Sequence, residues 1–197
     1  MKIAYNFGKN KWNKDDFFYA YSPAAKAHKK FIQDGDCIRN SYNEDISDYD
    51  YISIVTKEKF SSPVTIRTKC SFESFGAPLI VLSDDISKNA DGTNIYGLHF
   101  ESVAYEEGGN VWHIVPWPER KECPRRSSLI GKTRFPIDDN SLIDIEITIQ
   151  GNQIISTING NDFIVTHDDI PEKFHVGITA CEGINRFYNF SVEKGEN

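Results

Sequence analysis

The sequence lacks the features of several large functional classes. Its 197 residues contain no long block of lysine or arginine, and the formal net charge is −7. Because phosphate binding depends on a basic surface, this composition argues against nucleic acid and anionic membranes as partners. No run approaches the roughly 18 apolar residues of a membrane span, and residues 1–16 lack the apolar core of a signal peptide. We therefore expect a soluble cytoplasmic protein; a secreted one whose signal had been removed would look the same.

Cysteine is scarce and carries no metal or redox motif. Cys37, Cys70, Cys123 and Cys181 form no CxxC pair and no cysteine–histidine spacing typical of a zinc site. Cys70 and Cys181 fall within expected strands, where we predict buried free thiols. The nucleophile motif G-x-S-x-G and the common glycine-rich phosphate loops are absent too. The sequence thus predicts no cofactor and no metal centre, and it leaves open whether the protein is an enzyme.

Residues 142–165 give the clearest structural signal in the chain. Isoleucine occupies every second position from 143 to 149 and alternates with polar residues, the period of a strand with one buried and one wet face. A second strand-like run follows, and the Asn-Gly pair at 159–160 predicts a type I′ turn into a third. This pattern is typical of a β-meander.

Comparable strand patterns recur along the chain. They are expected at residues 51–56, 64–72, 79–82, 96–105, 110–115, 129–135, 174–181 and 186–193. Residues 1–45 indicate irregular short strands and loops, and no amphipathic helix, repeat or linker is evident. The sequence therefore predicts a single all-β domain over residues 1–197, with the N-terminal region packed on it.

Three segments together resemble the concanavalin A-like lectin/glucanase superfamily. Residues 54–69 are similar to its early strand pair, residues 143–160, ending in Ile-Asn-Gly, to its meander, and residues 174–192 to its closing pair. The order and spacing fit over roughly residues 50–193. The resemblance implies a two-sheet antiparallel jelly-roll β-sandwich, laminin G-like in outline, whose concave sheet handles glycans. Members include lectins, carbohydrate-binding modules, glycoside hydrolases and polysaccharide lyases.

Asp144 and Glu146 are the first candidates for chemistry. Two positions apart on a strand, they share a face, with Cα atoms about 6.5–7 Å apart, and paired carboxylates are the machinery of glycosidases. The glucanases of the superfamily carry a Glu-x-Asp-x-x-Glu strand, whereas this chain reads Asp-Ile-Glu-Ile-Thr and lacks both flanking glutamates. We therefore interpret the pair as solvent-facing strand polars.

The hairpin over residues 96–117 is the stronger candidate. Pairing Val103 with His113 would give one face that carries His99, Glu101, Tyr105, His113 and Trp117. Such a face offers an aromatic platform for a sugar ring and titratable groups for acid–base chemistry. A one-residue slip would place Trp112 there instead, and the sequence does not choose between the registers.

Basic residues are expected to join this face for an acidic ligand such as a uronate. The candidates are Arg67 and Lys69 on the polar side of their strand, and Arg120, Arg125 and Arg126 in the loop after Trp117. The alternative is that these are solvated charges on an acidic protein.

Two further groups of residues could hold a metal ion, but the sequence supports each only weakly. Oxygen ligands for calcium are available from Asp84, Asp85, Asn89 and Asp91, but the loop departs from the EF-hand pattern, and a polar turn is the simpler interpretation. No family motif supports a zinc site formed by His99, Glu101 and His113.

The sequence thus favours carbohydrate binding on the concave face of a lectin-like sandwich, with an oligo- or polysaccharide as the partner. The ligand-binding residues would be Trp117, Trp112, Tyr105, Arg67, Lys69 and Arg120. The alternative is a glycoside hydrolase or polysaccharide lyase on the same scaffold, with Glu101, His99 and His113 as its catalytic set. A protein-interaction sandwich is a third hypothesis. Glycan identity and oligomeric state stay open.

Overall fold

The computed structural model describes residues 2–22, 30–40, 51–121 and 123–195. Apart from one 3-10 turn at Lys14–Asp16, its regular structure is all strand. The strands are β1 Lys2–Asn6, β2 Phe17–Ala20, β3 Ile32–Asp34, β4 Cys37–Arg39, β5 Tyr51–Thr56, β6 Val64–Glu73, β7 Ala77–Ser83, β8 Ile86–Lys88, β9 Asn94–Tyr96, β10 His99–Tyr105, β11 Gly108–Pro116, β12 Arg125–Arg134, β13 Ile143–Gln150, β14 Gln153–Ile158, β15 Asn161–Thr166, β16 His175–Cys181 and β17 Ile184–Lys194.

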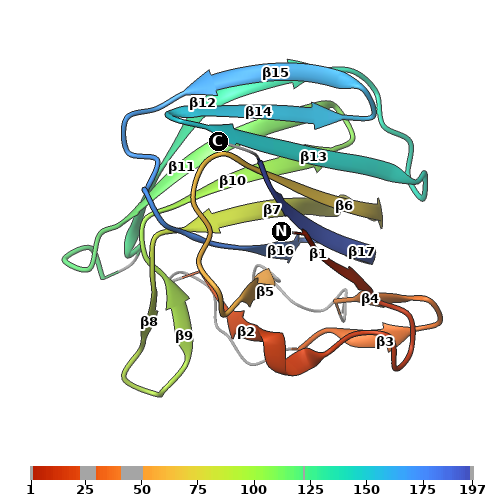
Figure 1. The fold of residues 1–197 in the computed structure, drawn as a ribbon, viewed down its shortest axis with the longest axis horizontal. Coiled ribbons are helices and arrows are strands. Elements are labelled where there is room, and N and C mark those ends of the chain that lie inside the picture. Colours follow the sequence, from red (N-terminus) through yellow and green to blue (C-terminus); the bar gives the residue numbers. More distant parts are fainter. Residues whose placement is uncertain (1, 23–29, 41–50, 122, 196–197) are drawn as a thin grey trace.

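These strands form two large antiparallel sheets (Figure 1). Sheet A has the order β15-β14-β13-β6-β17-β4-β3, and β1 pairs with β17 beside it. Sheet B has the order β12-β11-β10-β7-β16-β5-β2, and β8 pairs with β9 as a separate hairpin. One apolar core contains side chains of both sheets. The predicted fold class, an antiparallel two-sheet β-sandwich, is confirmed.

The predicted isoleucine row builds the sheet A side of this core. Ile143, Ile145, Ile147 and Ile149 on β13 are at most 1% exposed, and β6 lies beside them. Cys70 on β6 is fully buried, as predicted, and burial raises the pKa of its thiol. Cys181, for which burial was also predicted, is only half-buried. In the turn between β14 and β15, Asn159 and Gly160 both have positive φ, as a type I′ turn requires.

The opposite face of sheet A is wet. Asp144 lies opposite Lys69, and Glu146 lies opposite Arg67, across the β13–β6 pair. The side chains form ion pairs, with Lys69 Nζ 2.9 Å from Asp144 Oδ1 and Arg67 Nε 2.5 Å from Glu146 Oε2. The interpretation of both carboxylates as solvent-facing strand polars is confirmed by these pairs and by their exposure.

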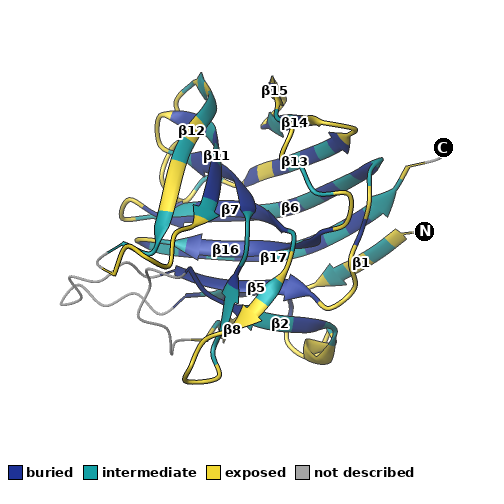
Figure 2. Ribbon diagram, turned by 90° about the vertical axis from the view of Figure 1, so that its left-hand side faces the viewer, coloured by how far each residue is buried: buried dark blue, intermediate teal, exposed yellow. Residues whose placement is uncertain are grey.

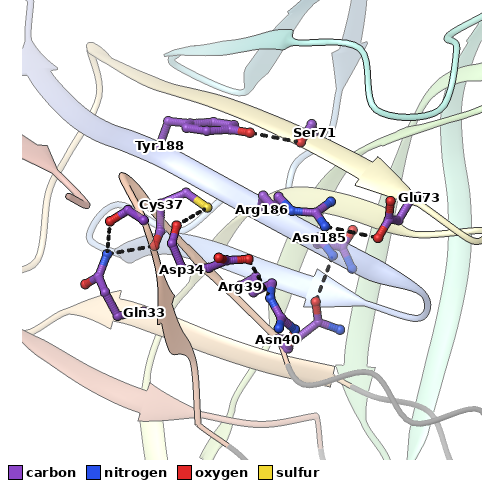
Figure 3. A network of polar contacts seen from close by, with 11 residues as sticks. Gln33, Asp34, Cys37, Arg39, Asn40, Ser71, Glu73, Asn185, Arg186 and Tyr188 are labelled. Atoms are coloured by element: carbon purple, nitrogen blue, oxygen red, sulfur yellow. Dashed lines mark hydrogen bonds and ion pairs between the residues drawn. The ribbon is translucent and has the colours of Figure 1, made fainter. Parts of the chain in front are cut away.

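The N-terminal strands are members of the sheets rather than additions to them: β2 extends sheet B, and β3 and β4 extend sheet A. Figure 3 shows polar contacts where β4 meets β17. Asn40 Oδ1 accepts from the Asn185 N–H at 2.7 Å, and its amide donates to the Gly183 carbonyl at 2.8 Å. Residues 23–29 and 41–45, part of the irregular region predicted over 1–45, lie outside the described residues.

Sheet B is covered on both faces near its centre. Consecutive residues of β5, β7 and β16 are buried, whereas β12 at the edge is mostly exposed or half-buried (Figure 2). A second apolar cluster explains this burial: Tyr96 of the β8–β9 hairpin packs with Tyr51, Leu79 and Val81 on the outer face of the sheet. The hairpin leaves the β10–β12 part of that face open.

Several boundaries differ from the sequence prediction. The strand expected at residues 96–105 is divided into β9 and β10, and the segment 83–94, read as turns, contains β8. β12 begins at Arg125, within the segment expected to be a loop. Among the described residues, no helix is long and apolar enough to cross a membrane.

Candidate functional site

The open part of the outer face of sheet B contains a pocket of about 470 Å³. Alternate residues of β10 and β11 reach it, because side chains on a strand alternate between the two faces of a sheet. Its lining consists of Phe75, Gly76, Ala77, Leu79, Glu101, Val103, Tyr105, Glu106, Asn110, Trp112, Ile114, Arg125, Ser127, Cys181 and Glu182. This is an apolar hollow with a few polar groups, the usual composition of a ligand site.

Glu101 is the buried acidic group of this pocket, with 6% of its surface exposed. Tyr51 of β5 donates its hydroxyl hydrogen to Glu101 Oε1 in a short hydrogen bond. His99 Nε2 lies 3.2 Å from the same oxygen. Both contacts therefore use Oε1, and they fix the position of a carboxylate that the β10 backbone delivers to the pocket.

His99 is oriented from its other side. Its Nδ1 lies 2.8 Å from the Gly97 carbonyl oxygen. A carbonyl only accepts hydrogen bonds, so Nδ1 carries a hydrogen and Nε2 is directed at Glu101. Complete burial raises the pKa of Tyr51 well above its ordinary value, and the nearby Glu101 carboxylate adds to this effect. Tyr51 is thus a neutral donor to Glu101 over the physiological pH range.

Trp112 lies directly opposite Glu101 across the β10–β11 pair. Its half-buried indole packs against the outer-face apolar cluster and lines the pocket, so it presents an aromatic surface beside the carboxylate. Asn110 adds an amide whose Oδ1 is buried without a hydrogen-bond partner among the described residues. Arg125 lines the same pocket and donates from Nη1 to Ser22 Oγ at 2.8 Å.

The structure corrects the predicted position of His113. Two residues, Glu106 and Glu107, connect β10 to β11, so Tyr105 pairs with Gly108 and Val103 pairs with Asn110 rather than with His113. A two-residue hairpin loop fixes the register, and this register turns the side chain of His113 to the inner face. There its ring stacks on buried Phe100 at 4.8 Å. His99 and Glu101 therefore converge, and His113 does not join them.

Of the predicted basic residues, Arg125 lines the pocket, and the others lie outside its lining. Arg67 and Lys69 lie on the outer face of sheet A, because β6 belongs to that sheet. Trp117, which is 43% exposed, lies after β11 outside the pocket lining, with the guanidinium of Arg120 5.9 Å from its ring centroid. Of the predicted ligand-binding residues, the pocket thus contains Trp112 and Tyr105.

Tyr51, which supports Glu101 from below, and Asn110, which lines the pocket, were not predicted from the sequence. Tyr51 is 50 residues from Glu101 in the chain, so only the pairing of β5 with β16 and of β16 with β7 brings it near. In the sequence, Asn110 marks only the start of an expected strand. The alternation of β10 and β11 would have placed Asn110 once the two-residue loop was recognised.

Two of the four candidate calcium ligands, Asn89 and Asp91, stabilise the turn of the β8–β9 hairpin. Asn89 Oδ1 accepts from the Ala90 N–H at 3.0 Å, and Asp91 Oδ1 accepts from the Thr93 N–H at 2.9 Å. These are side-chain turns of the kind that Asn and Asp commonly make. The simpler interpretation of this loop, a polar turn, therefore agrees with its contacts.

Comparison with known proteins places this architecture. No family model matches the sequence, and no curated protein gives a significant match. Solved structures do match: the exoplasmic/lumenal domain of VIP36 in its Ca²⁺/Man3GlcNAc-bound form superposes with a TM-score of 0.65 at 8% identity, covering 98% of this chain and 89% of that one. The chain has a concanavalin A-like jelly-roll fold.

Two further structures of different activities share this jelly roll. The carbohydrate-binding module CBM66 from Bacillus subtilis matches with a TM-score of 0.60 at 12% identity, covering 85% of this chain and 92% of that one. A glycoside hydrolase family 16 endo-glucanase from Bacteroides ovatus matches with a TM-score of 0.60 at 10% identity, covering 97% and 99%. At these identities the likeness establishes the fold, and function has to be argued from the site.

Proposed function

We propose that the protein binds an oligo- or polysaccharide in the sheet B pocket. The observation that carries the proposal is the pairing of Trp112 with Glu101 in one hollow of about 470 Å³. An indole face packs against the apolar side of a sugar ring, and a fixed carboxylate accepts hydrogen bonds from its hydroxyls. The glycan-binding proteins among the structural matches agree with this ligand class.

The pocket is arranged for such a ligand in other respects. Tyr51 and His99 already hold Glu101 in place, so little conformational entropy is lost when a ligand binds it. Asn110 Oδ1 offers an acceptor with no partner among the described residues, and Arg125 adds a positive charge at the β12 side of the pocket. Glu101, Glu106 and Glu182 line the same pocket, so its carboxyl groups outnumber the single guanidinium of Arg125, and a neutral glycan is a better match than a uronate.

The test is a glycan array followed by calorimetry on the hits, with Trp112→Ala as the diagnostic variant. Removing one aromatic stacking surface from a binding site is expected to cost about 1–3 kcal/mol, which is a loss of affinity of about 5- to 150-fold. Trp117→Ala is the matched control, because Trp117 lies outside the pocket lining. Equal affinities in both variants, or no binding to any glycan by the wild type, would overturn the proposal.

A second candidate function is glycan cleavage at the same pocket. It is favoured by the chain of contacts from Gly97 through His99 to Glu101, since an oriented imidazole beside a carboxylate is a common acid–base arrangement. Reducing-sugar and unsaturated-uronate assays distinguish this function from binding alone. Product formation that disappears in Glu101→Gln would identify an enzyme, and binding without product would identify a lectin-like module.

A further inference from the structure

A second group of polar side chains lies on the other side of sheet B from the glycan pocket. His113 extends from β11 toward the sandwich interior, and His167 and Asp169 belong to the connection between β15 and β16. Each of the three offers one nitrogen or carboxylate oxygen, and these atoms all lie within 4.8 Å of one another. The connection crosses from sheet A to sheet B (Figure 1), so the group joins the two sheets.

His113 is the buried member of the group, with 8% of its surface exposed. Its Nε2 faces Asp169 Oδ2 at 3.4 Å, yet it has no hydrogen-bond partner among the residues described. Burying a polar atom without a partner is unfavourable, and native structures avoid it unless something fills the role. The ring cannot easily turn away, because it stacks on Phe100 at 4.8 Å.

The other two members are positioned by the backbone around them. The His167 N–H donates to the Asn152 carbonyl at 2.9 Å, which holds the start of the connection against the β13–β14 turn. The backbone N–H of Asp169 donates to His167 Nδ1 at 3.2 Å and orients the His167 ring. A neutral imidazole has one lone pair, so a metal bound through either ring nitrogen would replace this hydrogen bond. The ring of His167 lies 4.2 Å from that of His113, and Asp169 is open to solvent on its outer side.

We propose that His113, His167 and Asp169 bind a divalent transition metal, with Zn²⁺ as the best match to two imidazoles and one carboxylate. Zinc holds nitrogen and oxygen ligands at about 2.0–2.1 Å, which puts tetrahedral ligands about 3.3–3.4 Å apart. The separation of His113 Nε2 and Asp169 Oδ2, 3.4 Å, has this value. The nitrogen of half-buried His167 has to approach by about 1–1.5 Å, and water completes the tetrahedron.

The bound ion would hold the β15–β16 connection against β11 and thus tie sheet A to sheet B. It would not touch the pocket on the other face.

The experiment is a zinc titration of the full chain, purified without a histidine tag and stripped with a chelator. We expect one equivalent to bind, and the Tm to rise by about 5–10 °C at a free zinc concentration about 100 times the Kd. His167→Asn and Asp169→Asn should each weaken zinc binding by at least about tenfold and remove most of the rise. Neither side chain is buried, so both variants should fold.

Asp168→Asn is the matched control, because Asp168 is the exposed neighbour that accepts from Asn152 Nδ2 instead of facing His113. It should bind zinc like the wild type. Replacing zinc with cobalt adds a spectroscopic check, since histidine and carboxylate ligands lack the charge-transfer bands of a thiolate. The proposal is overturned if the wild type binds no zinc, if His167→Asn and Asp169→Asn keep full affinity, or if thiolate bands appear.

Discussion

Glu101 and Trp112 are direct cross-strand partners on the outer face of sheet B. Side chains directly opposite in an antiparallel pair have Cβ atoms about 4.5–5.5 Å apart, so the carboxylate and the indole can contact one sugar ring together. The other neighbour of Glu101, Val81 on β7, is a buried member of the outer-face apolar cluster. The hydroxyl that fixes Glu101 comes from β5, and the stability of the pocket therefore depends on sheet B as a whole.

The first prediction concerns the contact between Tyr51 and Glu101. Tyr51→Phe removes the buried hydroxyl that donates to Glu101, and we expect the free energy of unfolding to fall by about 1–3 kcal/mol. Urea denaturation measures this change, with Tyr105→Phe at the pocket surface as a control. A double-mutant cycle with Glu101→Gln should show a coupling greater than about 0.5 kcal/mol; additive effects would contradict the contact.

The second prediction concerns the isoleucine row of β13. Ile147 is fully buried in the main core, so Ile147→Ala should lower the free energy of unfolding by about 2–5 kcal/mol through lost burial and a residual cavity. Ile164 on β15 is 61% exposed, and Ile164→Ala should change stability by no more than about 0.5 kcal/mol. Chemical denaturation of both variants measures the difference, and similar costs would argue against the strand register.

The all-β fold was predictable because strand alternation is a local signal. The isoleucine row needs only its own sequence to identify a buried face, and the Asn159–Gly160 turn needs only two residues. The covered strands β5 and β16 were predicted as well, at residues 51–56 and 174–181, although burial on both faces removes the alternation and leaves only continuous apolar or β-rich runs. β8 was not predicted, because a strand of three residues between polar segments is too short to show an alternating pattern.

The site was less predictable because it depends on pairing between distant strands. A one-residue change of register moves every side chain of a strand to the other face of the sheet. The observed register of the β10–β11 hairpin places His113 on the opposite face from Glu101. Arg67 and Glu101 both lie in expected strands, but the sequence does not say that β6 and β10 belong to different sheets. For the same reason, the sequence does not show that the ring of His167 lies next to that of His113.

The third prediction concerns the ion pairs on the wet face of sheet A. Glu146 is 40% exposed and pairs with Arg67, which also contacts Glu193 Oε2 from Nη1 at 2.9 Å. Glu146→Gln should cost less than about 1 kcal/mol of stability, because exposed ion pairs contribute little. The difference should shrink further in high salt. Glycan binding should stay at the wild-type level, since Glu146 lies on the other sheet; a loss of binding would move the ligand site to sheet A.

The fourth prediction concerns pH and His175, which is 6% exposed on the outer face of β16. Its Nδ1 lies 2.8 Å from the Thr56 carbonyl oxygen. Burial lowers the pKa of this imidazole from 6.5, and Lys59 adds to the effect. The Thr56 hydrogen bond, Asp85 and Asp84 act in the opposite direction. The unfolded chain therefore binds the proton more readily than the folded one.

Stability linked to His175 should accordingly be fully present above about pH 6.5 and should decrease as the pH falls toward the lowered pKa of the folded state. Urea denaturation between about pH 7.5 and pH 5 measures it, a range that stays above the titration of most carboxyl groups. In His175→Gln, whose amide can still donate to the Thr56 carbonyl, the decrease over this range should be smaller. An unchanged pH dependence in that variant would show that other groups cause the loss of stability in acid.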